Sequence, residues 1–248
     1  FLEKKKKAGK SDSLRRAQQS FYSENSNQTP YIRAAFYTPW TVKTSLPDLE
    51  KNGDKLNTIF PEWFFIDTNS KYKLASKIDS AGLAVMRSKG LAIIPIISNY
   101  NSSLPHPDFD GKLLHTILND SIKRRTFLKN IVDTLEFYKL QGVNIDFENI
   151  DEPTNDALTK FQKEVYTELH SREMMVTMDV AVKNNDYDYK SLSNYNDYII
   201  LMAYDEFSEP GKPGPVSSQR WIEEAVDWTA KKIDPEKVIL GFAGYGYN

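Results

Sequence analysis

The sequence contains no cysteine, few histidines and no long apolar run. Without cysteine, disulfides, thiol nucleophiles and thiolate metal ligands are all excluded. The histidines, His106, His115 and His170, are not spaced as metal ligands, so a catalytic zinc site is not expected. No apolar segment approaches the roughly 18 residues that a membrane-spanning helix needs. A Gly-rich phosphate-binding loop is also missing after the first predicted strand, which argues against Rossmann-type nucleotide binding.

Positive charge is concentrated in the first 16 residues, which hold seven Lys or Arg against two acids. The remainder of the chain then has 25 basic and 32 acidic residues, a net charge of −7. An acidic body argues against nucleic-acid binding. We interpret residues 1–30 as a basic and polar tether and residues 31–248 as one domain. Because Phe1-Leu2 precedes a lysine cluster, an upstream membrane anchor and an arbitrary chain boundary both stay open.

Strand-like and helical segments alternate from Tyr31 onward. The predicted strands are residues 32–37, 58–67, 91–99, 141–148, 174–182, 197–204 and 237–242. The predicted helical segments between them are residues 46–51, 79–89, 111–139 (ending with the segment 122–139), 155–171 and 218–232. This alternation indicates parallel strands with right-handed crossovers, in either a doubly wound sheet or a (β/α)8 barrel. Pro95 inside the third strand predicts a bulge or a missing ladder bond.

Polar and aromatic side chains gather at the carboxyl ends of the predicted strands, where a barrel carries its active site. They are Tyr37, Trp40, Asp67, Asn99, Glu148, Asp179, Tyr204, Asp205 and Tyr245. We therefore predict an α/β fold of the (β/α)8 (TIM) barrel class. Only seven strands are counted, and an eighth is missing from the sequence, so open edges are expected at the first and seventh strands.

The segment from Gln141 to Glu148 has two faces when it is read with the two-residue period of a strand. The apolar face holds Val143, Ile145 and Phe147, and the polar face holds Asn144, Asp146 and Glu148. Acids two positions apart on a strand lie about 6.6 Å apart, close enough to influence each other's ionisation. We expect one pKa to be raised, as a general acid near neutral pH requires. An edge strand with a solvated face and a structural polar network are the alternatives.

Two motifs resemble those of glycoside hydrolase family 18. The segment Gly142-Val143-Asn144-Ile145-Asp146-Phe147-Glu148 resembles the fourth-strand signature Asp-Gly-x-Asp-x-Asp-x-Glu, and Met202-Ala203-Tyr204-Asp205 resembles the Met-x-Tyr-Asp motif. Residues 205–247 are similar to the bacterial branch of spore-cortex and other peptidoglycan-lytic enzymes. Within it they are most similar to the module that some bacterial proteins fuse to a glycosyltransferase and a polysaccharide deacetylase. The resemblance covers roughly residues 31–248.

The resemblance implies retaining, substrate-assisted hydrolysis of β-linked N-acetylhexosamine polymers, without a metal ion or an organic cofactor. Glu148 would be the general acid and later the base, while the substrate's own acetamido oxygen is the nucleophile. Asp146 would orient the acetamido N–H, and Tyr204 would hydrogen-bond the acetamido carbonyl. Further candidate substrate-binding residues are Asn144, Asp205, Tyr37, Trp40, Asn99, Met178, Glu206 and Tyr245.

The sequence departs from the family signature at Gln141 and Asn144, where the signature usually has Asp. Asn144 would still hydrogen-bond Asp146 without repelling it, so we expect an altered pH profile rather than loss of activity. The eighth strand, which in the family supplies a Trp beneath the sugar, is also missing.

The branch favours peptidoglycan or poly-N-acetylglucosamine over chitin as the glycan, and a location in the cell envelope, outside the cytoplasm. A lectin-like module of the same fold, holding glycan for fused synthesis or deacetylation domains, is the alternative. Inactive relatives typically lose the acid, which this chain keeps as Glu148. A metal-dependent hydrolase on the same barrel finds no ligand set in the sequence.

Overall fold

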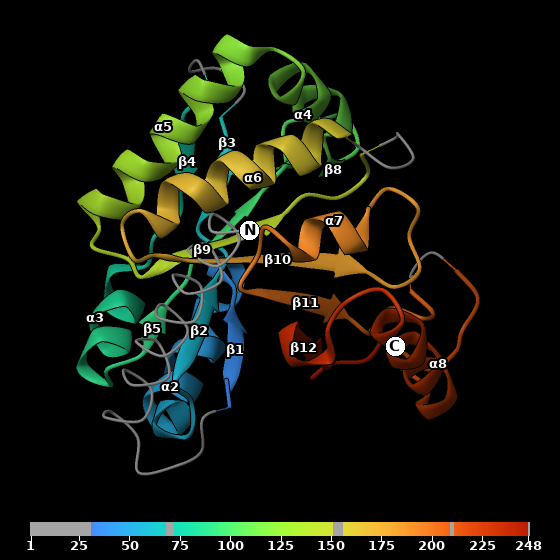
Figure 1. Cartoon of the computed structure of the whole chain (residues 1–248). Helices are drawn as coiled ribbons and strands as arrows, with labels where there is room; N and C mark the ends of the chain where they lie inside the picture. Colours follow the sequence, from blue (N-terminus) through green and yellow to red (C-terminus); the bar gives the residue numbers. More distant parts are fainter. Residues whose placement is uncertain (1–30, 68–71, 151–155, 209–210, 248) are drawn as a thin grey trace. The chain divides into compact units, whose positions relative to one another are not determined.

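The computed structural model describes residues 31–67, 72–150, 156–208 and 211–247 (Figure 1). The predicted tether, residues 1–30, lies outside the described residues. The described residues form two compact units, one with residues 31–61 and 78–93, the other with residues 62–67, 72–77, 94–150, 156–208 and 211–247. In the part of the chain that is described, no helix has the length and apolarity to cross a membrane.

The first unit contains a three-stranded parallel sheet in the order β1–β2–β5. Its strands are β1 (Ala34–Tyr37), β2 (Thr58–Pro61) and β5 (Ala92–Ile93). Its helices are α2 (Val42–Asn52) and α3 (Ser80–Ser88), with short 3-10 turns η1 (Pro39–Thr41) and η2 (Gly53–Lys55). Helix α3 begins where the Asp79 carboxylate accepts hydrogen bonds from the Ala81 and Gly82 N–H groups. The chain turns out of α3 at Gly90, whose φ of 64° suits a residue without a side chain.

The second unit contains a seven-stranded sheet in the order β12–β11–β10–β9–β6–β3–β4. Its strands are β3 (Phe64–Ile66), β4 (Leu74–Ser76), β6 (Ile96–Ser98), β9 (Gly142–Asp146), β10 (Met175–Ala181), β11 (Tyr198–Met202) and β12 (Val238–Gly241). All neighbours pair in parallel except β4, which is antiparallel to β3. A small antiparallel hairpin, β7 (Tyr100–Asn101) and β8 (Asp108–Phe109), follows β6.

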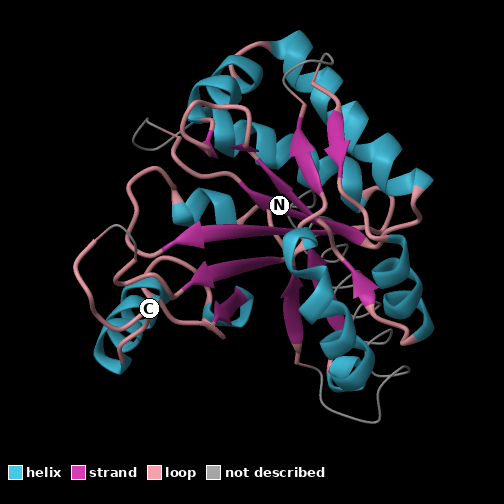
Figure 2. Cartoon of the chain, turned by 180° about the vertical axis from the view of Figure 1, so that it is seen from behind, coloured by secondary structure: helices cyan, strands magenta, loops and turns pink. Residues whose placement is uncertain are grey.

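The helices of the second unit separate its parallel strands in the sequence. They are α4 (Gly111–Leu118), α5 (Ser121–Phe137), α6 (Asp156–His170), α7 (Tyr189–Ser193) and α8 (Gln219–Ala230), with the 3-10 turn η3 (Pro235–Lys237) before β12. Helices α4, α5 and α6 pack against one another and lie along the same side of β9 and β10 (Figure 1). From behind, the long strands β10 and β11 run side by side (Figure 2). The parallel strands with crossover helices confirm the predicted α/β fold.

Strand β9 is central in the sheet, between β6 and β10, so the alternative of a solvated edge strand is wrong. Its apolar face packs under the helices: Phe147 stacks on Phe127 of α5 and Phe161 of α6, with ring centroids 6.4 and 6.1 Å away. All three phenylalanines are fully buried. The polar face is buried as well, with Asn144 fully buried and Asp146 9% exposed, which is unusual for a charged side chain.

Two predicted strands are interrupted. The segment 58–67 forms β2 and β3, with Glu62 and Trp63 between them, and Pro61, which has no N–H to donate, ends β2. The segment 91–99 forms β5 and β6, and the break falls at Pro95 as expected. The short elements β4, β7, β8 and α7 were not anticipated, because strands of two or three residues and a helix of little more than one turn show no period.

Candidate active site

Four carboxylates of the second unit influence one another's ionisation. Glu62 lies just before β3, Asp146 ends β9, Glu148 follows β9, and Asp179 lies in β10. We call these four residues the acid cluster. The parallel register pairs Met178 with Ile145, and its continuation places Asp179 beside Asp146. The polar faces of the adjacent strands β9 and β10 therefore form one buried acidic region.

Asn144 is held in one orientation by its neighbours on β10. Its side-chain amide donates to Asp179 Oδ2 at 2.6 Å, and its side-chain oxygen accepts from the Thr177 hydroxyl at 2.7 Å. The expected hydrogen bond from Asn144 to Asp146 is thus replaced by one to Asp179. This explains why an amide suits position 144: it stabilises the Asp179 carboxylate, whereas an aspartate would add a further negative charge.

The backbone on either side of Glu148 is fixed by two buried side chains. Asn99 donates its amide to the Glu148 carbonyl at 2.9 Å and accepts from the Glu148 N–H at 3.0 Å. Tyr187 donates its hydroxyl to the carbonyl of Phe147 at 2.8 Å. Asn99 follows β6 and Tyr187 follows β10, so the strands on both sides of β9 hold the residue that carries the acid. Asn99, predicted to bind substrate, uses its amide to position Glu148.

Burial and mutual repulsion raise the pKa values of the acid cluster. Burial, with the charges of Asp146, Asp108 and Asp205, raises the pKa of Glu148 to about 8. Burial and the charge of Glu62 also raise the pKa of Asp146, against a hydrogen bond from Ser98 that lowers it. For Asp179, burial and the charge of Asp146 raise the pKa well above its usual value. One raised pKa was expected, and the geometry raises several because the acids share a poorly solvated region.

Glu62 was not recognised as a candidate from the sequence. It stands between Pro61 and the aromatic run Trp63-Phe64-Phe65, inside a segment that reads as one buried strand. The interruption of that strand brings its carboxylate to the acid cluster, where burial and the charge of Glu148 raise its pKa to about 7. A single glutamate within an otherwise apolar strand is the only signal in the sequence that pointed to it.

Replacing Glu62 with glutamine is expected to stabilise the protein more at pH 8 than at pH 4. The folded protein raises the pKa of Glu62 from 4.5 to about 7, so its ionisation opposes folding. The contribution of Glu62 to the free energy of unfolding is fully present below pH 4.5, and it is lost as the pH rises to about 7. Glutamine removes this loss, which we expect to be roughly 1–3 kcal/mol. Urea unfolding at both pH values measures it.

The matched control is Glu50→Gln, the same substitution at an exposed position of α2. Its stability should follow that of the parent protein at both pH values. An unfolding free energy of Glu62→Gln that keeps a constant offset from the parent at pH 4 and pH 8 would contradict the assignment.

Tyr204 follows β11 and is half-buried beside the acid cluster. Burial, together with the charges of Asp179 and Asp146, raises its pKa far above the usual range, so its hydroxyl stays protonated and can donate. Its ring meets that of Tyr245, with centroids 6.3 Å apart, and Tyr245 meets Tyr247 at 5.7 Å. The hydroxyls of Tyr245 and Tyr247 both donate to Asp205 Oδ1, at 2.7 and 2.9 Å. Tyr247 therefore joins this group, although only Tyr245 was predicted.

The remaining candidates have other surroundings. Glu206 accepts the Ser218 N–H at 2.7 Å and so holds the loop that leads into α8. Met178 is fully buried and pairs in register with Ile145, between the polar positions of its strand, which is a core position. Tyr37 and Trp40 belong to the first unit. There Tyr37 donates its hydroxyl to Asp79 at 2.5 Å, whereas Trp40 is 64% exposed.

Within the described residues, no group of three or more His, Asp or Glu side chains is arranged to hold a metal ion. Carboxyl groups with raised pKa values can exchange protons, and they can contact a positively charged or N–H-bearing group.

The chain matches the family model described as Glycosyl hydrolases family 18 over residues 21–248. It is 28% identical over 213 residues to the glycosylase YvbX of Bacillus subtilis, covering 82% of this chain and 61% of that protein. It is 23% identical to the cortical fragment-lytic enzyme of Bacillus anthracis, covering 75% of this chain and 44% of the enzyme. The chain thus spans about half the length of these relatives.

Solved structures share the fold. A chitinase from Chromobacterium violaceum superposes with a TM-score of 0.77 at 18% identity, over 88% of this chain and 70% of the chitinase. The spore cortex-lytic enzyme SleL of Bacillus cereus superposes with a TM-score of 0.74 at 20% identity, over 85% of this chain and 50% of the SleL chain. The predicted class, an α/β fold of the (β/α)8 type with seven strand positions in the described residues, is confirmed. The chain belongs to glycosyl hydrolase family 18.

Proposed function

We propose that the chain hydrolyses glycans of β-linked N-acetylhexosamine, with retention of configuration and with help from the substrate's acetamido group. The observation that carries the proposal is Glu148, which is half-buried, anchored through its backbone by Asn99, and has a pKa of about 8. A carboxylic acid with this pKa is protonated at neutral pH and can donate a proton to a glycosidic oxygen.

Asp146 and Tyr204 would hold the acetamido group. Asp146 Oδ1 is buried and has no hydrogen-bond partner among the described residues, so it can accept the acetamido N–H. Tyr204 keeps its proton and can donate to the acetamido carbonyl. These two contacts would turn the carbonyl oxygen towards the anomeric carbon. Its attack breaks the glycosidic bond, and the proton of Glu148 goes to the leaving oxygen.

The acid cluster favours the charge that develops in this reaction. Bond cleavage places positive charge on the sugar ring and then on the oxazolinium ring. An ionised carboxylate in this poorly solvated region attracts a neighbouring cation more strongly than it would in water, so Asp146 and Asp179 would stabilise the charge when they are ionised. Glu148, now ionised, would then remove a proton from the attacking water.

Bacterial peptidoglycan is the glycan that the comparisons favour. The names of the cortical fragment-lytic enzyme of Bacillus anthracis and the spore cortex-lytic enzyme SleL of Bacillus cereus refer to lysis of the spore cortex. A poly-N-acetylglucosamine is the second choice, since chitinases share the fold. Either polymer implies action in the cell envelope, outside the cytoplasm. Fusion to glycosyltransferase and deacetylase domains and an upstream membrane anchor stay predictions from the sequence.

The test is turnover of purified cortex peptidoglycan, poly-N-acetylglucosamine and chitin oligosaccharides, with products followed by mass spectrometry and proton NMR. Hydrolysis should first release the β-anomer, because two displacements retain configuration. N-deacetylated chitin oligosaccharides are the matched control and should not be cleaved, since they lack the acetamido oxygen. Binding of these glycans without turnover would contradict the proposal and favour a lectin-like module.

A further inference from the structure

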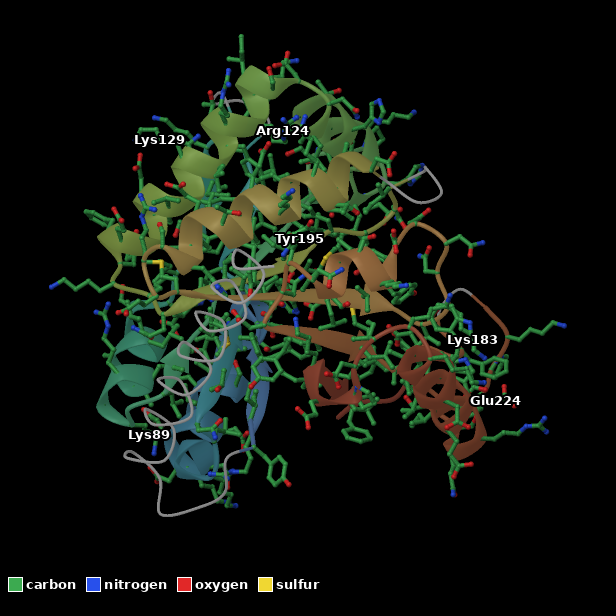
Figure 3. The ribbon with its side chains drawn as sticks, viewed as in Figure 1. Lys89, Arg124, Lys129, Lys183, Tyr195 and Glu224 are labelled. Carbon is green, nitrogen blue, oxygen red and sulfur yellow. The ribbon has the colours of Figure 1, made fainter. Side chains whose placement is uncertain are left out.

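A cavity in the second unit is lined by the loop that follows β10 and by residues of α7 and α8. Its volume is about 610 Å³, within the range of small-ligand sites. Tyr187 and Tyr189 from this loop and the start of α7 form one wall, and Trp228 of α8 forms another. Lys183, which precedes the lining residue Asn184, pairs with Glu224 of α8, and their charged groups lie 3.8 Å apart (Figure 3).

The cavity is positively charged on a chain whose net charge is −2. Lys190, Lys231 and Lys232 line it, against a single acid, Asp188. The Asp188 carboxylate is occupied by the Ser191 N–H at 3.1 Å, where it caps α7. Lysines after the end of α8 also offset the helix dipole, but that explains neither Lys190, which comes from α7, nor the convergence of all three.

The ammonium groups have few partners in the chain. Lys232 Nζ lies 4.7 Å from the centroid of the Trp228 ring, a cation–π contact. Among the described residues, the Lys231 side chain forms no ion pair or hydrogen bond. Two bases thus face a cavity of this size without a carboxylate to pair with.

The other lining groups suit a sugar. The Trp228 ring meets Tyr189 edge to face at 4.8 Å and is only half-buried, so part of the indole remains open to the apolar side of a pyranose. Asn184 and Asn185 add amide groups that can bind hydroxyls. Asn184 already accepts the Asp186 N–H at 2.8 Å with its side-chain oxygen, which leaves its NH₂ group for a ligand.

We propose that this cavity binds carboxylate groups carried by the glycan substrate, and so makes the chain prefer acidic amino-sugar polymers to neutral ones. The wall residue Tyr187 connects the cavity to the acid cluster, because its hydroxyl holds the carbonyl of Phe147, the residue before Glu148. The carboxylate has two sources in a wall glycan: the lactyl group of muramic acid or the attached stem peptide. That the ligand is the substrate of this chain depends on the proposed function. The evidence for a carboxylate-binding site is the cavity and its lysines, and it does not depend on that function.

The test compares three probes bound to the Glu148→Gln protein, in which turnover is suppressed. The probes are a tetrasaccharide of alternating N-acetylglucosamine and N-acetylmuramic acid, the same tetrasaccharide with stem peptides, and neutral chitotetraose. Calorimetry should show that Lys231→Ala/Lys232→Ala weakens binding of an acidic probe by about five- to tenfold. Binding of chitotetraose should not change, and added salt should reduce the difference between the two proteins.

The matched control is Lys129→Ala/Lys160→Ala, which removes the same charge from exposed positions of α5 and α6. It should bind all probes as the parent does. Lysine dependence with both acidic probes assigns the lactyl carboxylate, and dependence with the peptide-bearing probe alone assigns the stem peptide.

Equal binding of acidic probes by the parent and the Lys231/Lys232 variant would overturn the proposal. So would an equal loss for chitotetraose, or no binding of any probe. The proposed hydrolysis is judged separately: lysine-dependent binding without cleavage by the wild-type chain refutes hydrolysis and leaves the cavity assignment intact.

Discussion

Glu148→Gln should lower kcat on any glycan that the chain cleaves by about 10²–10⁴-fold, the usual contribution of a positioned general acid. Glutamine has nearly the same shape and keeps the backbone, so the hydrogen bonds with Asn99 at 2.9 and 3.0 Å remain. It cannot donate a proton to the leaving oxygen, nor accept one from water. KM should change little, because the acid acts in the transition state rather than in binding.

Stopped assays on the favoured glycan, with kcat and KM determined separately, measure the effect. Glu50→Gln on the exposed face of α2 is again the control for the substitution itself and should keep full activity. A Glu148→Gln protein that turns over within a factor of about two of wild type would remove Glu148 from the mechanism, since a loss of that size is far below general acid catalysis.

The pH profile of the wild-type protein follows from the same carboxylate. Glu148 must be protonated, so kcat/KM should fall as the pH rises through about 8. Asp146 must be ionised to accept the acetamido N–H. Because its pKa is raised, kcat/KM should fall on the acid side at a higher pH than the usual pKa of an aspartate. Because the two acids are coupled, the pKa values obtained from the two sides of the pH profile belong to the pair rather than to either residue. The pH optimum lies in a narrow window near neutral pH.

The strand that carries the acid could be predicted because its two-residue period is visible within the sequence. Val143, Ile145 and Phe147 indicate the buried face, and the acids on the other face indicate the site. The positions of the helices followed from the same kind of local pattern. Glu148 and Asp146 could therefore be named as candidates from this segment, and the roles given to them stay predictions.

The partners of these residues depend on register and on interruptions, which no local pattern shows. Asn144 hydrogen-bonds Asp179 because β10 pairs with β9 so that Thr177 lies opposite Asn144. Glu62 reaches the acid cluster because a strand breaks at that residue. Tyr187 lies in a loop without periodicity, and only the fold brings its hydroxyl to Phe147. Long-range contacts of this kind are the part that the sequence alone leaves open.

Phe147→Ala should be the most destabilising single substitution on β9 or its extension. Phe147 is fully buried and stacks with Phe127 and Phe161, whose rings also stack on each other at 5.5 Å. Removing a buried phenylalanine ring typically costs about 3–5 kcal/mol, because contacts are lost and a cavity remains. For a chain of this length that corresponds to a decrease in Tm of about 10 °C. Differential scanning calorimetry measures it.

Phe137→Ala is the matched control, since it makes the same change on α5 at a side chain that is 78% exposed. It should shift Tm by no more than about 1–2 °C, as surface substitutions usually do. Equal Tm values for the two variants would contradict the packing of Phe147 between α5 and α6. Phe147 precedes Glu148 and its backbone carbonyl accepts from Tyr187, so a backbone shift after loss of the ring should lower the activity of the folded Phe147→Ala protein as well. The two faces of this strand thus depend on each other, because the stacked rings that stabilise the fold also fix the position of Glu148.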